Sequence, residues 1–350
     1  MRSRVRTILV FAITVALLAF FFRNANLANV WAETRRADPL LLALALGVTL
    51  LTYALRASRW QVLLAPIGAT RFSTAFRTTV IGFAASFFLP ARAGEVIRPY
   101  LLAKREGLRP TAAFATIILE RLLDLAAVLL LFGVFVFTVA DGVLSEDGSQ
   151  FAHVKFWGGV AAVSSVAALV LLFALAGHPE RLGRAAGRIE RVLPARAARL
   201  VAHLVETFAQ GLAVMRSPAK LAVALALSFP LWLSIAAGIW LASRAFHITF
   251  PYPASFLIMT VLVVGVAVPT PGAIGGFHAA YQFSVVRFFA ASDDAAVGAG
   301  IVLHAISFVP VTILGIFFMA REGLTLSGVQ RLADSGPPGH APGEPGVMSR

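Results

Sequence analysis

The chain has 350 residues, of which 59% are hydrophobic and only 13% charged, and its mean hydropathy is +0.83. Because soluble domains are about 45–50% apolar and about 25% charged, this composition excludes an ordinary soluble domain. The net charge of +13 lies mainly between apolar runs, which favours membrane orientation and contact with anionic lipid headgroups over nucleic-acid binding.

Apolar runs long enough to cross a hydrocarbon core about 30 Å thick recur along the chain. They predict about six full spans, at residues 7–22, 39–57, 111–140, 156–176, 219–243 and 295–319. The first run follows a basic N-terminal segment, and we interpret it as an uncleaved first helix rather than a signal peptide. The predicted fold is therefore all-α, a polytopic membrane helix bundle.

Two further apolar segments are each interrupted by proline and glycine. The first, residues 78–103, breaks at Pro90, and the second, residues 252–291, breaks at Pro269. Broken backbone at membrane depth is tolerated only inside protein or beside a wet cavity, so both segments are predicted to be re-entrant hairpins. Basic loops mark the cytoplasmic side, which places the first hairpin on that side and the second on the opposite side.

Loop charge also predicts how the chain is oriented in the membrane, and composition predicts where its transmembrane domain ends. Four arginines and no acid follow the second predicted span, namely Arg56, Arg59, Arg71 and Arg77. Residues 177–217 form the most basic polar segment, and both regions are assigned to the cytoplasm together with the two termini. Residues 1–322 are thus predicted to form one transmembrane domain, and residues 323–350, rich in proline and glycine, a disordered tail.

The two hairpins and the spans that follow them are similar to each other. Residues 112–119 and 296–303 are identical at four of eight positions, and each hairpin contains Pro-x-x-x-Gly, at Pro90 and at Pro271. Since loop charge gives the two units opposite orientations, the pattern predicts inverted repeats. In transporters such repeats place the binding site between interrupted segments.

Ionisable side chains within apolar segments are costly, at about 2.5–3.5 kcal/mol or more at the bilayer centre, so they usually have a partner or a function. We interpret those of this chain as a polar cavity in which arginines bind lipid phosphate and carboxylates hold the arginines. The candidate substrate-binding residues are these groups and the residues of the two breaks: Arg92, Gly94, Glu95, Arg98, Glu120, Arg121, Asp124, Pro271, Gly272, Gly275, Gly276 and His278.

Two other interpretations of these residues stay open. Glu120 and Asp124 can pair with arginines only to hold the bundle together, and His304 in the last span is expected to be a packed, hydrogen-bonded histidine. An intramembrane lipid-modifying enzyme would use Glu95 or His278 in acid–base roles. The sequence has no Ser/His/Asp order, metal-ligand spacing, P-loop or cysteine, so we predict no catalytic residue, metal or cofactor.

Three motifs occur in order along the chain: Pro90-x-Arg92-x-Gly94-Glu95-x-x-Arg98, Glu120-Arg121-x-x-Asp124 and Pro269-x-Pro271-Gly272-x-x-Gly275. Together they resemble the lysylphosphatidylglycerol synthase transmembrane-domain family of flippase-like bacterial and archaeal membrane proteins. The resemblance covers about residues 5–322. One difference is His278, which stands where the family often has an acidic residue, and whose imidazole can donate a hydrogen bond to phosphate.

The resemblance implies a lipid flippase of a bacterial inner (cytoplasmic) membrane, moving a polar or anionic lipid, aminoacylated or sugar-bearing, between leaflets. In the best-understood relatives a separate soluble domain adds the amino acid. The present chain ends about 28 residues after its last predicted span, so we expect transport without aminoacyl transfer. The expected partners are membrane lipids and no nucleic acid. The alternative is a non-catalytic membrane partner of a separately encoded glycosyltransferase or lipid synthase.

Overall fold

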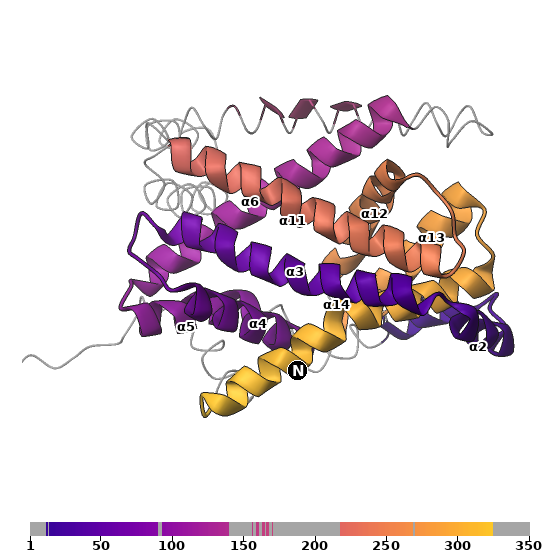
Figure 1. Ribbon diagram of the computed structural model, residues 1–350, viewed down its shortest axis with the longest axis horizontal. Coiled ribbons are helices and arrows are strands. Elements are labelled where there is room, and N and C mark those ends of the chain that lie inside the picture. Colours follow the sequence, from indigo (N-terminus) through magenta and orange to yellow (C-terminus); the bar gives the residue numbers. More distant parts are fainter. Residues whose placement is uncertain are drawn as a thin grey trace, which may run out of the picture.

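The computed structural model describes residues 12, 14–89, 93–139, 218–268 and 270–324, together with isolated positions between 156 and 170. Every regular element in this part of the chain is a helix (Figure 1), which confirms the all-α prediction. Three of the described helices are long and apolar enough to cross a membrane: α3 (Pro39–Leu64), α11 (Pro218–Ala245) and α14 (Asp293–Arg321). The chain is therefore a multi-pass membrane protein.

The other described helices are α2 (Leu27–Arg36), α4 (Phe72–Phe88), α5 (Gly94–Glu106), α6 (Pro110–Thr138), α12 (Ser255–Ala267) and α13 (Gly276–Phe289), with the short 3-10 turns η2 (Tyr252–Ala254) and η3 (Pro271–Ala273). Of the predicted span at 7–22, residues 14–22 are helical. The predicted span at 156–176 lies outside the described residues apart from isolated positions. The basic segment 177–217 and all but the first two residues of the predicted tail lie outside them as well.

Local sequence explains where the long helices begin. α3 starts at Pro39 after Asp38, whose carboxylate accepts hydrogen bonds from the backbone N–H of Leu40 at 2.8 Å and of Leu41 at 3.2 Å. α14 starts after Ser292, whose hydroxyl accepts from the Ala295 N–H at 3.3 Å. Both helices are thus fixed at their first turn by a capping side chain.

One prediction about α3 is wrong. The sequence predicts Arg56 and Arg59 in a loop after a span that ends at about residue 57, but α3 continues to Leu64 and both side chains are buried, at 8% and 0% exposure. The helix continues because residues 58–64 contain neither proline nor glycine, and it ends where Ala65 precedes Pro66. Only Arg71 and Arg77 of the four predicted loop arginines follow α3.

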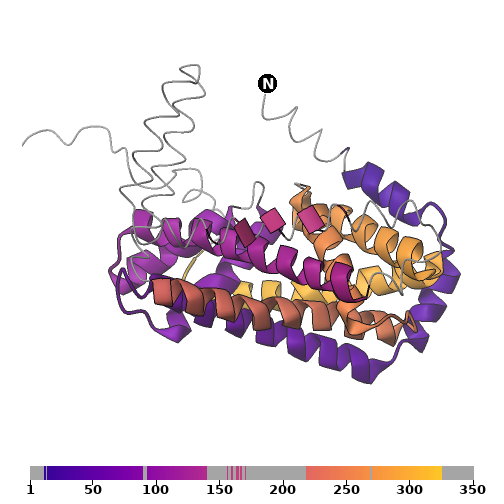
Figure 2. The ribbon, with the colours of Figure 1, turned by 90° about the horizontal axis from the view of Figure 1, so that it is seen from above.

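The two halves of the chain contain the same order of helices. A long helix is followed by two short helices and then by a second long helix: α3, α4, α5 and α6 in the first half, and α11, α12, α13 and α14 in the second. α3 and α11 pack side by side and run in opposite directions (Figures 1 and 2). The directions of α6 and α14 are likewise opposed.

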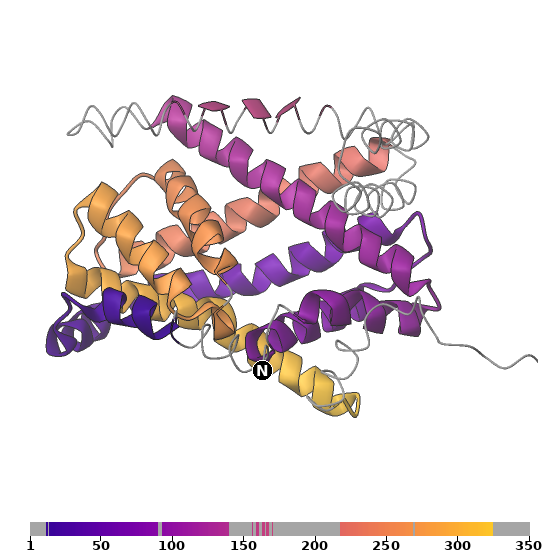
Figure 3. The ribbon, with the colours of Figure 1, turned by 180° about the vertical axis from the view of Figure 1, so that it is seen from behind.

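The halves also interlock. α4 of the first half packs against α14 of the second, and α12 of the second half packs against α6 of the first (Figure 3). In each half the two short helices pack against each other, and the second of them packs against the long helix that follows. The same set of neighbours therefore recurs in both halves.

Each pair of short helices meets at two glycines, one on each side of its break. A Cβ atom added to Gly94 would overlap the carbonyl oxygen of Gly82, and a Cβ added to Gly265 would lie 2.5 Å from the carbonyl oxygen of Gly276. Only glycine permits such close contact between two helix backbones. The breaks that the sequence places in residues 78–103 and 252–291 thus separate helices whose backbones touch.

Candidate functional site

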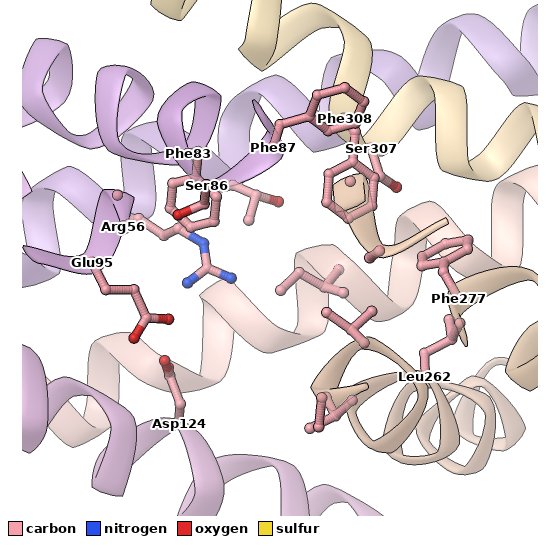
Figure 4. Close-up of a pocket in the computed structure, with 18 of the residues that line it drawn as sticks. Arg56, Phe83, Ser86, Phe87, Glu95, Asp124, Leu262, Phe277, Ser307 and Phe308 are labelled. Atoms are coloured by element: carbon pink, nitrogen blue, oxygen red, sulfur yellow. The ribbon is translucent and has the colours of Figure 1, made fainter. Parts of the chain in front are cut away.

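A cavity of about 870 Å³ lies between the two halves and is lined by helices of both. Its charged lining comes from α3, α5 and α6, whereas α12, η3, α13 and α14 supply mainly apolar side chains. Figure 4 shows Arg56, Glu95 and Asp124 gathered at one end, with Leu262, Phe277 and Phe308 toward the other. The cavity is therefore amphipathic along its length.

Buried ion pairs lie behind the charged end of the cavity. The Arg59 guanidinium lies 2.6 Å from an Asp124 carboxylate oxygen and 3.4 Å from a Glu120 oxygen, and the Arg98 guanidinium lies 3.0 Å from the same Glu120 oxygen. The Arg59 and Glu120 side chains have no exposed surface. Because a buried charge without a partner is strongly destabilising, these pairs hold α3, α5 and α6 together.

A second ion pair faces the cavity. Arg121 lies 3.5 Å from a Glu95 carboxylate oxygen and 3.6 Å from the second oxygen of Asp124. The Arg121 and Glu95 side chains are 40% and 34% exposed, unlike the pairs behind them. Both can therefore exchange their mutual contact for one with a polar ligand, at a modest cost for such partly solvated pairs.

Neutral groups fix the orientation of the buried charges. From α11, the Ser228 hydroxyl accepts a hydrogen bond from Arg59 at 2.9 Å, and the Trp232 indole N–H donates to Asp124 at 2.9 Å. The Arg98 guanidinium lies 3.9 Å above the Trp60 ring, a cation–π contact. The charged residues of the first half are thus oriented partly by the second.

Arg56 differs from the other arginines of the site. No carboxylate of the described residues lies within salt-bridge distance of it, and its Nη1 atom is buried without a hydrogen-bond partner. Its guanidinium lies 5.2 Å from the Phe83 ring and 5.9 Å from the Trp232 ring. In Figure 4 it points into the space between Glu95 and Asp124.

We define the charge cluster as Arg56, Arg59, Glu95, Arg98, Glu120, Arg121 and Asp124. Counted over these described residues, four arginines and three carboxylates give a net charge of +1. Such an excess in a cavity of low dielectric attracts an anion.

The apolar part of the cavity reaches the outer surface of the helices. Phe88, Leu125 and Val263 line it and are nevertheless 46%, 53% and 37% exposed. The surroundings of such apolar side chains in a membrane are lipid chains. The cavity thus has an apolar edge at which acyl chains can remain in the bilayer while a headgroup lies inside.

The two histidines lie together at the break of the second half. His304 Nε2 is 2.8 Å from the Gly272 carbonyl oxygen, His278 Nδ1 accepts a hydrogen bond from the Gly275 N–H at 3.4 Å, and the ring centroids are 4.6 Å apart. Both side chains are buried, and neither is among the residues that line the cavity. The two histidines thus hydrogen-bond to the interrupted backbone at Gly272 and Gly275, and Gly272 itself lines the cavity.

The structure brings together most of the residues that the sequence singles out. The cavity lining includes Gly94, Glu95, Arg98, Arg121, Asp124, Pro271 and Gly272. Glu120 lies behind it in the charge cluster, Gly275 and Gly276 belong to the break without lining the cavity, and Arg92 lies outside the described residues.

Sequence reasoning missed four members of the site, namely Arg56, Arg59, Ser228 and Trp232. A signal was present for Arg56, because Tyr53, Arg56 and Trp60 fall on one face of a helix with no breaker before Pro66, and the same lack of a breaker places Arg59 inside that helix. Ser228 and Trp232 lie in an apolar span without any charged neighbour that would mark them.

Comparison with known proteins gives two matches. Residues 7–315 match the family model described as the lysylphosphatidylglycerol synthase TM region. The glycosyltransferase AglD of Haloferax volcanii is 28% identical over 148 residues, which are 41% of this chain and 23% of that protein. The aligned part is thus less than a quarter of the length of that relative.

Proposed function

Because the chain belongs to the lysylphosphatidylglycerol synthase transmembrane-region family, we propose that it transports a polar or anionic lipid, aminoacylated or sugar-bearing, between the leaflets of the cytoplasmic membrane. It does so as a transporter without chemistry of its own. The observation that carries the proposal is the amphipathic cavity between the two halves, which is charged at one end and apolar at the other.

Transport of a lipid headgroup requires a path on which the headgroup stays solvated. A charged group in the hydrocarbon core costs several kcal/mol, and the charge cluster replaces its water with fixed ionic partners. Arg121, Arg56 and Glu95 line the cavity; the two arginines would contact phosphate, and Glu95 would accept hydrogen bonds from headgroup hydroxyls or amines. Acyl chains would stay in the bilayer beside Phe88, Leu125 and Val263.

The arrangement of the halves suggests how the cavity changes sides. We propose that the two pairs of short helices, α4 with α5 and α12 with α13, are re-entrant hairpins of opposite orientation in inverted repeats. The opposed directions of α3 and α11 and of α6 and α14 support this. Inverted repeats with interrupted helices rock about a central site in alternating access.

The test is lipid translocation in proteoliposomes with labelled anionic, aminoacylated and sugar-bearing lipids. Glu95→Gln and Arg121→Ala should abolish protein-dependent transfer, because both side chains line the cavity. Arg35→Ala on the exposed surface of α2 is the matched control and should transfer lipid like the parent protein. Lipid transfer that is unchanged in both cavity variants would exclude this cavity as the path of the headgroup.

The likeness to part of AglD favours one other candidate function, that of a non-catalytic membrane partner for a separately encoded glycosyltransferase or lipid synthase. That function predicts co-purification of such an enzyme from the native membrane. It also predicts that Glu95→Gln and Arg121→Ala leave the enzyme's activity unchanged. Under this function the purified protein transfers no lipid, or transfers it equally well in both variants. That outcome separates the two candidates.

A further inference from the structure

Arg56 is a buried cation in the cavity wall, with no carboxylate partner among the described residues. It is only 8% exposed, and its Nη1 atom has no hydrogen-bond partner. Three residues further along α3, Arg59 is held by Asp124, Glu120 and Ser228. One helix thus carries one arginine that is paired with carboxylates and one that, among the described residues, is not.

Arg56 borders the cavity between two aromatic residues and two hydroxyl-bearing ones. The Phe83 and Trp232 rings lie 5.2 and 5.9 Å from its guanidinium, and all three side chains line the cavity. The Thr52 and Tyr53 side chains lie on the preceding turn of α3 and line the same space. The planar fork of N–H donors of a guanidinium matches the oxygens of a phosphate group.

The charge of the cluster limits which phosphate fits. Among the described residues its four arginines and three carboxylates have a net charge of +1, so a ligand with one negative charge makes this set of charges neutral. A phosphomonoester carries about 1.5–2 negative charges near pH 7 and would leave a buried negative charge without a partner. A phosphodiester carries one.

We propose that Arg56 is the residue that binds the lipid phosphate, and that the cavity selects lipids whose headgroup is joined through a single phosphodiester. The chemistry is shared by glycerophospholipids and by polyprenyl phosphosugars. Arg56 would bind the phosphate oxygens and Glu95 would accept a hydrogen bond from the group beyond the phosphate. This inference deepens the proposed function and rests on it, because it names the headgroup chemistry of the transported lipid.

The test is equilibrium binding of single lipids to the purified chain, measured by native mass spectrometry. The probes are phosphatidylglycerol, a polyprenyl phosphoglucose, phosphatidic acid with the same acyl chains as the phosphatidylglycerol, and a phosphate-free glucosyl diacylglycerol. The parent protein should bind at least one of the two phosphodiesters about tenfold or more tightly than phosphatidic acid or the glycolipid. The phosphodiester that binds more tightly shows whether the apolar part of the cavity accepts diacylglycerol or polyprenyl chains.

Variants of α3 assign the effect to Arg56. Arg56→Gln should weaken phosphodiester binding about 10- to 100-fold, as expected for the loss of a charge-assisted hydrogen bond, and Arg56→Lys should lose less. The exposed Arg35→Gln is the control and should bind like the parent protein. Phosphodiester binding unchanged in Arg56→Gln, or phosphatidic acid bound as tightly as phosphatidylglycerol, would overturn the proposal.

The binding test also separates this inference from the proposed function. If the selectivity and its dependence on Arg56 are found but the protein transfers no lipid in proteoliposomes, the site stands and transport fails. If lipid is transferred without discrimination between phosphate types, transport stands and the assignment to Arg56 fails. Should Arg56→Gln not fold, the comparison of the four lipids on the parent protein and the Arg56→Lys variant still decide.

Discussion

Arg56 and Arg59 lie three residues apart on the same helix, yet only Arg59 is paired with carboxylates, one from Asp124 at 2.6 Å and one from Glu120 at 3.4 Å. Both side chains are buried. The pair of positions therefore separates two uses of a buried arginine, one that stabilises the bundle and one that is kept available for a ligand.

Replacing these two arginines should affect the stability of the protein differently. Arg59→Gln leaves buried carboxylates uncompensated and should lower the free energy of unfolding by about 3–5 kcal/mol. Arg56→Gln removes a buried charge that has no carboxylate partner among the described residues, and should leave stability unchanged or raise it. Thermal unfolding of the detergent-solubilised variants measures both, and an Arg56→Gln variant as unstable as Arg59→Gln would contradict the distinction.

The glycine contacts of the short helices predict a sharp position dependence for alanine. Gly94→Ala places a Cβ into the Gly82 carbonyl oxygen and should cost about 1–3 kcal/mol through overpacking. Gly47→Ala in α3 is the matched control, because no atom outside its own helix lies within 4 Å of the added Cβ. The control should be neutral or slightly stabilising, since alanine favours helix more than glycine does.

The same contact in the second half supplies an independent check. Gly276→Ala meets the Gly265 carbonyl oxygen and should destabilise to a similar extent as Gly94→Ala. Midpoints of thermal unfolding would show it. A large effect in one half and none in the other would mean that the two helix pairs are not equivalent.

Trp232 supplies a hydrogen bond that a smaller aromatic residue cannot. Trp232→Phe keeps an aromatic ring but removes the N–H that donates to Asp124 at 2.9 Å, and should destabilise the protein by about 1–3 kcal/mol. Trp31→Phe is the control, because Trp31 is 62% exposed. Equal unfolding temperatures for the two variants would show that Asp124 does not need this donor.

The membrane orientation can be measured with single cysteines, since the native chain contains none. Lys104→Cys near the end of α5 should react with an impermeant maleimide from the cytoplasmic side, and Ser292→Cys before α14 from the opposite side. Both positions are exposed. Labelling of both from one side would rule out hairpins of opposite orientation.

Much of this architecture could be predicted from the sequence because its signals are local. Apolar length predicts helices that cross a membrane, and Pro90 and Pro271 with their neighbouring glycines predict the two breaks. The charges at Glu95, Glu120 and Asp124 were conspicuous because their surroundings are apolar.

The rest could not be predicted, because it depends on contacts between distant segments. Arg56 and Arg59 follow an apolar run as loop charges do, and the positive-inside rule counts arginines without knowing which are buried. His278 and His304 lie 26 positions apart in the sequence, and only packing brings their rings within 4.6 Å of each other. Nothing in the sequence near Ser228 indicates that it faces Arg59.

The pairing of Arg59 with Ser228 has a consequence for biosynthesis. The two residues are 169 positions apart, so α3 and α6 leave the ribosome and enter the translocation machinery long before α11 is made. Until then Arg59 and Asp124 have their ionic partners from the first half but lack the hydroxyl and indole of α11 that complete their hydrogen bonds. The hydrogen bonds of these buried charges are therefore completed only when α11 packs against α3 and α6.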